Sequence, residues 1–209
     1  MKTLALDESV KLAEKYGIRF AKTVSAKTEH EMEAACRRIG FPVAMKVISP
    51  KISHKTESGG VKVGIHTMEE AKGAFGKMRS LQGFEGVIVQ QMVRGIEIII
   101  GGIRDVQFGP AVLFGSGGIY AEIFKDVTLR LCPVDRKTAL EMVKGIKAYP
   151  ILAGARGTEG ADTDEIVKAI MGVSRMMVKE TSVNELDLNP LMATKTHLYA
   201  VDARVVVSE

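Results

Sequence analysis

Residues 49–60 read SPKISHKTESGG, a stretch whose residue types suit the binding of phosphate. It follows the apolar run VAMKVI, which contains Lys46. Consecutive backbone N–H groups at Ser58, Gly59 and Gly60 can wrap phosphate oxygens, because glycine lets the main chain approach a ligand closely. The lysines expected to converge here are Lys46, Lys51, Lys55 and Lys62. The stretch therefore predicts a phosphate site, although a plain surface loop would have a similar composition.

His54 lies in the middle of this stretch and adds a second possibility. Neutral imidazole is a competent phosphoryl acceptor near neutral pH, since its unperturbed pKa is about 6.5. Neighbouring lysines could neutralise charge on a transferring phosphoryl group. The histidine could equally do no more than donate a hydrogen bond to bound phosphate, and its residue type alone does not decide between these roles.

A second group of polar residues lies in ELDLNPL (185–191) and YAVDARV (199–205). Asp187 and Asn189 alternate along one predicted strand, and Asp202 lies in another. Hard oxygen donors on adjacent strands suit Mg²⁺, which takes one or two protein ligands together with phosphate oxygens. A capped strand end is the alternative, since Asn-Pro often opens a turn.

Three further features could contact a ligand. Glu97 interrupts the apolar run IEIII, where a carboxylate is costly unless it faces outward or meets a partner such as a ribose hydroxyl. The glycines of LFGSGGIYAEIFKDVTLR (113–130) suggest a close backbone approach. Arg156 lies between two glycines in ILAGARG and could grip an anion or form a salt-bridged corner.

The elements that position these residues follow from capping and periodicity. Thr28, Thr67 and Asp162 each precede a glutamate by three residues, which is typical of helix N-termini. We expect helices at 8–16, 29–39, 68–80, 136–147 and 163–180, and strands at 43–48, 61–65, 86–92, 96–103, 111–114, 183–188 and 198–207.

The strands 86–92 and 96–103 are separated by too few residues for a crossover helix, so we expect them to be antiparallel. This favours an α+β fold with mainly antiparallel or mixed sheets. We expect a smaller lobe over 1–90, which carries the phosphate and histidine loop, and a larger lobe over 91–209, which carries the Mg²⁺ site.

Composition excludes several classes of protein. A net charge of +4, no tryptophan and only 5% aromatic residues argue against nucleic-acid binding. No apolar run approaches the ~18 residues of a membrane helix. Two cysteines are too few for a disulfide framework and match no zinc spacing. We therefore expect a cytoplasmic protein.

Taken in order, the long stretches of the chain resemble one family. They are GFPVAMKVISPKISHKTESGGVKVGI, GIEIIIGGIRDVQFGPAVLFGSGGIYAEIFKDVTLRLCP, KAYPILAGARG, ELDLNPL and AVDARV. They are similar to the β subunits of ADP-forming acetyl-CoA (acyl-CoA) synthetases, which are best known from archaea. A weaker likeness to succinyl-CoA synthetase β subunits is present in GGVKV and in the N-P-L segment. The resemblance implies an ATP-grasp fold, in which two lobes hold ATP between them.

The resemblance also implies a role for each candidate residue. Lys46, Lys55 and the turn Ser58, Gly59 and Gly60 would contact the ATP phosphates. The adenine hinge would be Gln91, Met92 and Val93, with Glu97 toward the ribose. Mg²⁺ would be held by Asn189 and Asp202, with Asp187 close by. His54 stands where these enzymes carry a phosphoryl-accepting histidine.

The implied reaction converts acyl-CoA, ADP and phosphate into the free acid, CoA and ATP. An α subunit with the CoA-binding domain and its own phosphorylated histidine would be the partner, in an α₂β₂ assembly. Two alternatives stay open: a stand-alone ATP-grasp ligase that joins a carboxylate to an amine, and a nucleotide-binding module without turnover.

Overall fold

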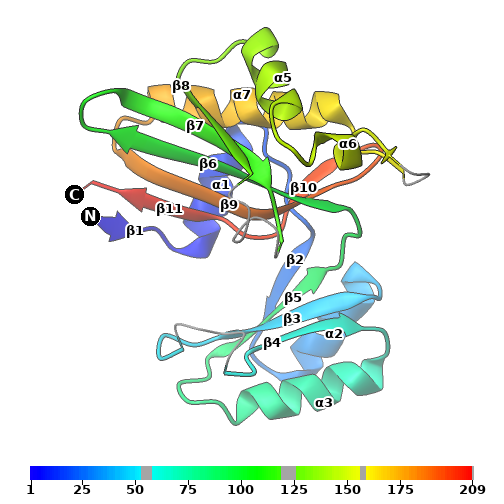
Figure 1. Ribbon diagram of the computed structural model, residues 1–209. Coiled ribbons are helices and arrows are strands. Elements are labelled where there is room, and N and C mark those ends of the chain that lie inside the picture. Colours follow the sequence, from blue (N-terminus) through cyan, green and yellow to red (C-terminus); the bar gives the residue numbers. More distant parts are fainter. Residues whose placement is uncertain (53–57, 119–125, 156–158, 209) are drawn as a thin grey trace. The chain divides into compact units, whose positions relative to one another are not determined.

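The computed structural model describes residues 1–52, 58–118, 126–155 and 159–208. The chain forms two compact units (Figure 1). The smaller unit is Ala21–Val93, and the larger unit combines Met1–Phe20 with Arg94–Glu209.

The smaller unit is a four-stranded antiparallel sheet with strand order β2-β5-β3-β4. Two helices with side-chain caps at Thr28 and Thr67 pack on it. Alternate residues of the central strand, including Val43, Met45 and Val47, are buried with the apolar stripes of both helices. The elements are β2 (Thr23–Ala26), α2 (Glu29–Ile39), β3 (Val43–Ile48), β4 (Val61–Ile65), α3 (Met68–Arg79) and β5 (Gly86–Gln91).

The larger unit is a seven-stranded sheet with the order β1-β11-β9-β6-β7-β8, in which β10 also pairs with β9. Every described ladder in it is antiparallel. The strands are β1 (Lys2–Thr3), β6 (Ile96–Asp105), β7 (Gly109–Ser116), β8 (Val127–Leu131), β9 (Val183–Ala193), β10 (Leu198–Ala200) and β11 (Arg204–Val207). The helices are α1 (Leu6–Lys15), α5 (Arg136–Lys144), α6 (Tyr149–Leu152) and α7 (Thr163–Lys179).

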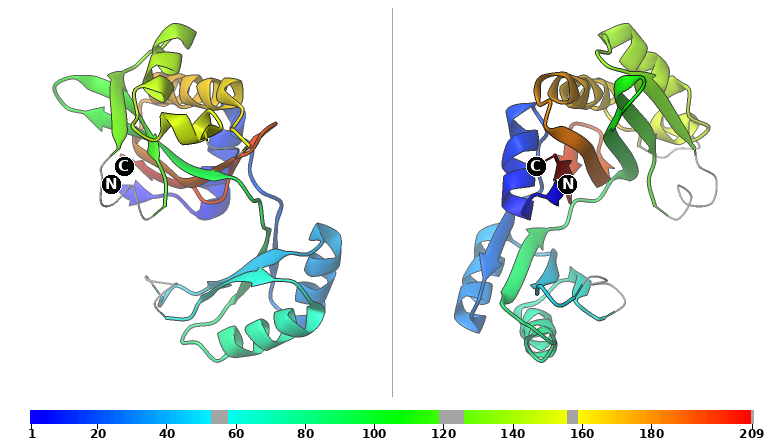
Figure 2. Two further views of the ribbon diagram at one scale, coloured as in Figure 1. Left: turned by 45° about the vertical axis from the view of Figure 1, so that its right-hand side comes forward. Right: turned by 90° about the vertical axis from the view of Figure 1, so that its left-hand side faces the viewer.

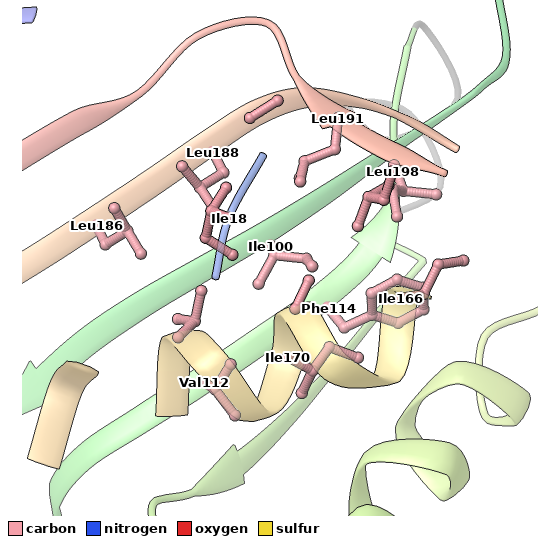
Figure 3. Close-up of a cluster of buried hydrophobic side chains, with 14 of the residues drawn as sticks. Ile18, Ile100, Val112, Phe114, Ile166, Ile170, Leu186, Leu188, Leu191 and Leu198 are labelled. Atoms are coloured by element: carbon pink, nitrogen blue, oxygen red, sulfur yellow. The ribbon is translucent and has the colours of Figure 1, made fainter. Parts of the chain in front are cut away.

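The core of the larger unit lies between this sheet and its helices. Ile166 and Ile170 of α7 point toward side chains of β6, β7 and β9, including Ile100, Phe114 and Leu188 (Figure 3). Side chains of β6 and β9 that alternate with these core residues therefore face the opposite side of the sheet.

The first twenty residues belong to the larger unit, whereas we expected them in the smaller lobe. Strand β1 pairs with β11, so the two ends of the chain lie side by side (Figure 2). The hydroxyl of Tyr16 also donates to Glu180 at 2.8 Å. These contacts join residues far apart in the sequence, and local periodicity carries no sign of them.

The predicted pairing of the strands at 86–92 and 96–103 is wrong. Strand β5 lies in the four-stranded sheet and β6 in the seven-stranded sheet. The short gap is the point where the chain passes from one unit to the other, at Val93 and Arg94. The broader expectation of an α+β fold with antiparallel sheets is confirmed.

The five predicted helices are present within a few residues of their expected bounds, and α2 is identical to its prediction. Strands β1, β2 and β8 and the short helix α6 were not predicted. Within the described parts of the chain, no helix combines the length and apolar composition that crossing a membrane requires.

Candidate functional site

In the smaller unit, strand pairing brings Lys46 beside the turn Ser58 to Gly60, which we call the glycine turn. Lys46 pairs with Val61, the residue that follows the turn, and is half-buried on the sheet face opposite the helices. The backbone N–H of Val47 donates to the carbonyl of Gly60 at 2.7 Å. Gly59 has φ +72°, a conformation that only glycine adopts readily. A lysine and a turn of backbone amides are thus neighbours, as the sequence predicted.

Among the other lysines expected at this turn, Lys62 does not lie on the same face of the sheet as Lys46. Met45 pairs with Lys62, so Lys62 lies on the opposite face of the sheet from Lys46. A Cβ built on Gly83 would lie 3.0 Å from Cγ of Lys51, so the stem of Lys51 lies beside Gly83. His54 and Lys55 lie outside the described residues.

The predicted adenine segment, Gln91 to Val93, ends the smaller unit. The N–H of Gln91 donates to the carbonyl of Lys22 at 2.8 Å, and the N–H of Met92 donates to the carbonyl of Pro42 at 3.2 Å. The sulfur of Met92 accepts the N–H of Gly64 at 2.9 Å. The segment is therefore held by neighbours on both sides, and two of its amide groups are already used.

In the larger unit, Glu97, Asp187 and Asn189 share one face of the sheet. Glu97 alternates with buried Ile98, and Asp187 lies between buried Leu186 and Leu188, so all three polar side chains face away from the core. The carboxylate of Glu97 is exposed, which is the outward-facing alternative for this residue.

The strand that carries Asn189 contains a bulge. Leu188 pairs with Ile100 and Leu191 with Ile98, so Asn189 and Pro190 together oppose a single residue of β6. A bulge is one of the few places where a strand tolerates proline, and bulges often re-aim side chains at functional sites.

The same bulge draws Asp202 toward the strand. The carbonyl of Pro190 accepts the N–H of Val201 at 3.0 Å. The carboxylate of Asp202 caps its own chain by accepting the N–H of Ala203 at 2.9 Å. The structure thus brings the Asn189 and Asp202 segments together, as predicted. The predicted single strand 198–207 is wrong, however, because Asp202 lies in the connection between β10 and β11.

The electrostatics of this group favour a cation. Burial raises the pKa of Asp187, and the negative charges of Glu185 and Asp202 raise it further, while Arg204 lowers it. A group of carboxylates that repel one another on a half-buried surface is stabilised by a bound positive charge.

These residues fit Mg²⁺ by their chemistry: two carboxylates and an amide oxygen. In the described ranges, no group of three or more His, Cys, Asp or Glu residues could hold a metal ion by itself. Other ligands, such as phosphate oxygens or water, would have to complete the coordination of a cation here.

Two cavities within the units carry none of the predicted site residues. One, of about 240 Å³, is lined by residues that include Arg19, Glu165 and Lys168, and the other, of about 370 Å³, lies beside Lys27 and Arg79. In the cavity of about 240 Å³, the carboxylate of Glu165 forms ion pairs with the guanidinium group of Arg19 at 3.8 Å and with the ammonium group of Lys168 at 2.8 Å. The charged groups that line this cavity are therefore already paired with one another.

Sequence reasoning gave no structural role to Asp126. Asp126 is buried, and its two carboxylate oxygens accept the N–H groups of Lys147 and Ala148 at 2.7 and 2.8 Å. It joins the start of β8 to the segment that leads into α6. An aspartate at the entry to a strand carries no local signal of such a long-range contact.

The comparison with protein families gives one description for nearly the whole chain. The model of the ATP-grasp domain matches residues 1–207. A β subunit of ADP-forming acetate–CoA ligase I from Pyrococcus furiosus is 41% identical over 96% of this chain and 90% of its own length. An ADP-forming acetate–CoA ligase I from Archaeoglobus fulgidus is 40% identical over 97% of this chain, which spans 30% of that relative's length.

Solved structures agree with these relatives. A structure of acetyl-coenzyme A synthetase 1 from Ca. Korarchaeum cryptofilum has a TM-score of 0.91 and 38% identity, over 99% of this chain and 94% of that chain. Another structure of the same enzyme, at a TM-score of 0.88 and 36% identity over 99% and 93% of the two chains, is described with Mg-AMPPCP and a phosphohistidine segment pointing towards the nucleotide binding site. The chain therefore belongs to the ATP-grasp family, together with the β subunits of ADP-forming acetate–CoA ligases.

Proposed function

We propose that this chain is the nucleotide-binding β subunit of an ADP-forming acyl-CoA synthetase. The observation that carries the proposal is the 41% identity to such a subunit over 96% of this chain and 90% of the relative. In the proposed reaction, acyl-CoA, ADP and phosphate become the free acid, CoA and ATP.

Lys46 and the turn Ser58 to Gly60 would bind the nucleotide phosphates, with Lys55. Two features support this role: Lys46 lies on a strand beside the turn, and Gly59 gives the turn a backbone that can approach an anion. A turn of N–H groups and one cation stabilise negative charge on a transferring phosphoryl group without reacting themselves.

Gln91, Met92 and Val93 would hold the adenine, with Glu97 toward the ribose. Because the N–H groups of Gln91 and Met92 already donate within the unit, the base would be recognised by the remaining backbone groups of this segment. The exposed carboxylate of Glu97 can accept a hydrogen bond from a ribose hydroxyl.

Asn189 and Asp202, with Asp187 close by, would hold Mg²⁺. When bound, the ion would neutralise part of the negative charge of the nucleotide phosphates. The bulge at Asn189 and Pro190 orients these oxygen donors. The pKa of Asp187 is raised first by burial and then by the negative charges of Glu185 and Asp202, and a bound cation would offset both effects.

His54 would carry the phosphoryl group between the partner subunit and ADP. In the first step the N–P bond of a phosphohistidine on the partner breaks and an N–P bond to His54 forms. In the second, that bond breaks as an oxygen of the ADP β-phosphate forms the new bond to phosphorus, which yields ATP. The phosphohistidine segment described in the Korarchaeum enzyme supports such a transfer.

The partner would be an α subunit with the CoA-binding domain, in an α₂β₂ assembly. The Archaeoglobus relative, of which this chain spans 30%, supports the view that further domains complete the enzyme. Relatives that are 37% and 35% identical are named for 4-hydroxybutyrate and trans-feruloyl groups. We infer that the partner subunit, rather than this chain, selects the acyl group.

The test is reconstitution with an α subunit, acetate, CoA, Mg²⁺ and ATP. The proposal predicts CoA-dependent ADP formation only when both subunits are present. Amide formation from a carboxylate and an amine by this chain alone would instead indicate a stand-alone ligase. Nucleotide binding with no turnover in the presence of cognate α subunit would indicate a non-catalytic module.

A further inference from the structure

The strand that carries Glu97 begins between two close backbone contacts. On one side, a Cβ built on Gly95 would lie 2.6 Å from the carbonyl oxygen of Ala193. On the other side, the N–H of Gly117 donates to the carbonyl of Glu97 at 2.8 Å. The backbone of Glu97 is thus fixed by β9 and by the residue that follows β7.

Two glycines after β7 approach Glu97 in different ways. A Cβ on Gly117 would lie 2.8 Å from the carbonyl carbon of Glu97 and 2.9 Å from the nitrogen of Ile98, so Gly117 admits the backbone. A Cβ on Gly118 would lie 3.0 Å from Oε2 of Glu97, so Gly118 leaves room for the carboxylate itself. Real Cβ atoms rarely approach another atom so closely.

We propose that Gly118 is a positioning residue, which acts through the Glu97 carboxylate and thereby sets the preference of the site for a nucleotide with an intact ribose. The inference rests on the proposed function, in which Glu97 lies toward the ribose. A Cβ at position 118 would lie 3.0 Å from Oε2, closer than ordinary van der Waals contact, so the carboxylate has to shift away from the place it takes beside glycine. Because Glu97 is a flexible exposed side chain, it moves while the sheet stays folded.

Backbone strain must be separated from this effect, since Gly118 also has φ +71°. Gly109, at the other end of β7, is a matched control. It has φ +81°, and a Cβ built on it meets nothing within 4 Å. Alanine at either position carries comparable conformational strain, but only alanine at position 118 contacts Glu97.

The experiment measures the Kd of ADP, 2′-deoxy-ADP and 3′-deoxy-ADP with Mg²⁺ for the full chain by calorimetry. We expect the unsubstituted chain to favour ADP over at least one deoxy analogue by about 10-fold, the value of a hydrogen bond to a charged group. Gly118→Ala reduces this ratio toward one, while Gly109→Ala leaves it unchanged. Gly118→Asn replaces the alanine variant if that variant does not fold, since asparagine tolerates positive φ better.

Glu97→Gln and the double variant complete the test. If Gly118 acts through Glu97, adding Gly118→Ala to Glu97→Gln lowers the ratio no further. A normal ratio in Gly118→Ala, with a reduced ratio in Glu97→Gln, would overturn the inference while the proposed role of Glu97 stands. A normal ratio in Glu97→Gln would overturn the ribose assignment in the proposed function, and the inference with it.

Discussion

The glycine turn of the smaller unit (Ser58 to Gly60) and the acidic group of the larger unit (Asp187, Asn189 and Asp202) are built in opposite ways. The turn relies on backbone: Gly59 at positive φ, the carbonyl of Gly60 bonded to Val47, and one lysine on a neighbouring strand. The acidic group relies on side chains carried by β9, an interior strand of a seven-stranded sheet, and by the Asp202 segment bonded to it.

This difference explains their opposite preferences for charge. Backbone N–H groups and an ammonium group favour an anion. Crowded carboxylates, whose mutual repulsion helps raise the pKa of Asp187, favour a cation. The turn by itself suits the phosphates of a nucleotide, and the carboxylates by themselves suit a divalent cation. Single substitutions can test each group against a matched residue that lacks the proposed contact.

We expect the largest effect from Lys46→Met, compared with Lys62→Met on the opposite face of the same sheet. The substitution removes a cation that stabilises the negative charge developing on the transferred phosphoryl group, and it should lower kcat/KM by about 10²- to 10³-fold. Lys62→Met should change kcat/KM by less than about threefold, because solvent and salt screen an exposed surface charge. Steady-state kinetics of the reconstituted enzyme measures both, and equal losses in the two variants would remove the phosphate role of Lys46.

Asp202→Asn should give the next largest effect, on the Mg²⁺ concentration that the reaction needs. Loss of a charged ligand raises the half-saturating concentration roughly 10- to 100-fold. Glu185→Gln, on the same sheet but outside the proposed ligand set, serves as the control and shifts it far less. An unchanged Mg²⁺ requirement in Asp202→Asn would move the metal away from this group.

Gly59→Ala should have a smaller effect, because it disturbs the turn without removing a charge. The control is Gly40→Ala at the end of α2. Gly40 has φ +83°, and an added Cβ meets nothing within 4 Å at either Gly40 or Gly59. Each variant loses about 1 kcal/mol of unfolding free energy. Only Gly59→Ala also weakens ATP binding, by about 10-fold. Calorimetry and thermal unfolding separate the two, and equal ATP affinity in both variants would contradict a phosphate contact at the turn.

Local signals in the sequence predicted the helices well. Capping residues such as Thr28 and Asp162 mark helix starts because they satisfy backbone N–H groups in their own neighbourhood. The neighbouring placement of Lys46 and the glycine turn was also predictable, since only 11 residues separate Lys46 from Ser58 along the chain.

Long-range contacts were not predictable in the same way. The gap between β5 and β6 has the length of a hairpin loop, yet the two strands join different sheets. The assignment of the first twenty residues depends on the pairing of β1 with β11, across the whole chain. The bulge at Asn189 and the bonds of Asp126 to Lys147 and Ala148 likewise follow from tertiary structure.

The most direct test of the proposed relay is the phosphorylation of His54. The chain is incubated with Mg²⁺ and γ-labelled ATP, and acid-labile phosphate is located by mass spectrometry. A relay through His54 predicts label on His54, its return to ATP when ADP is added, and loss of both in His54→Ala with ATP binding retained. Normal ATP synthesis by His54→Ala in the reconstituted enzyme would contradict the relay.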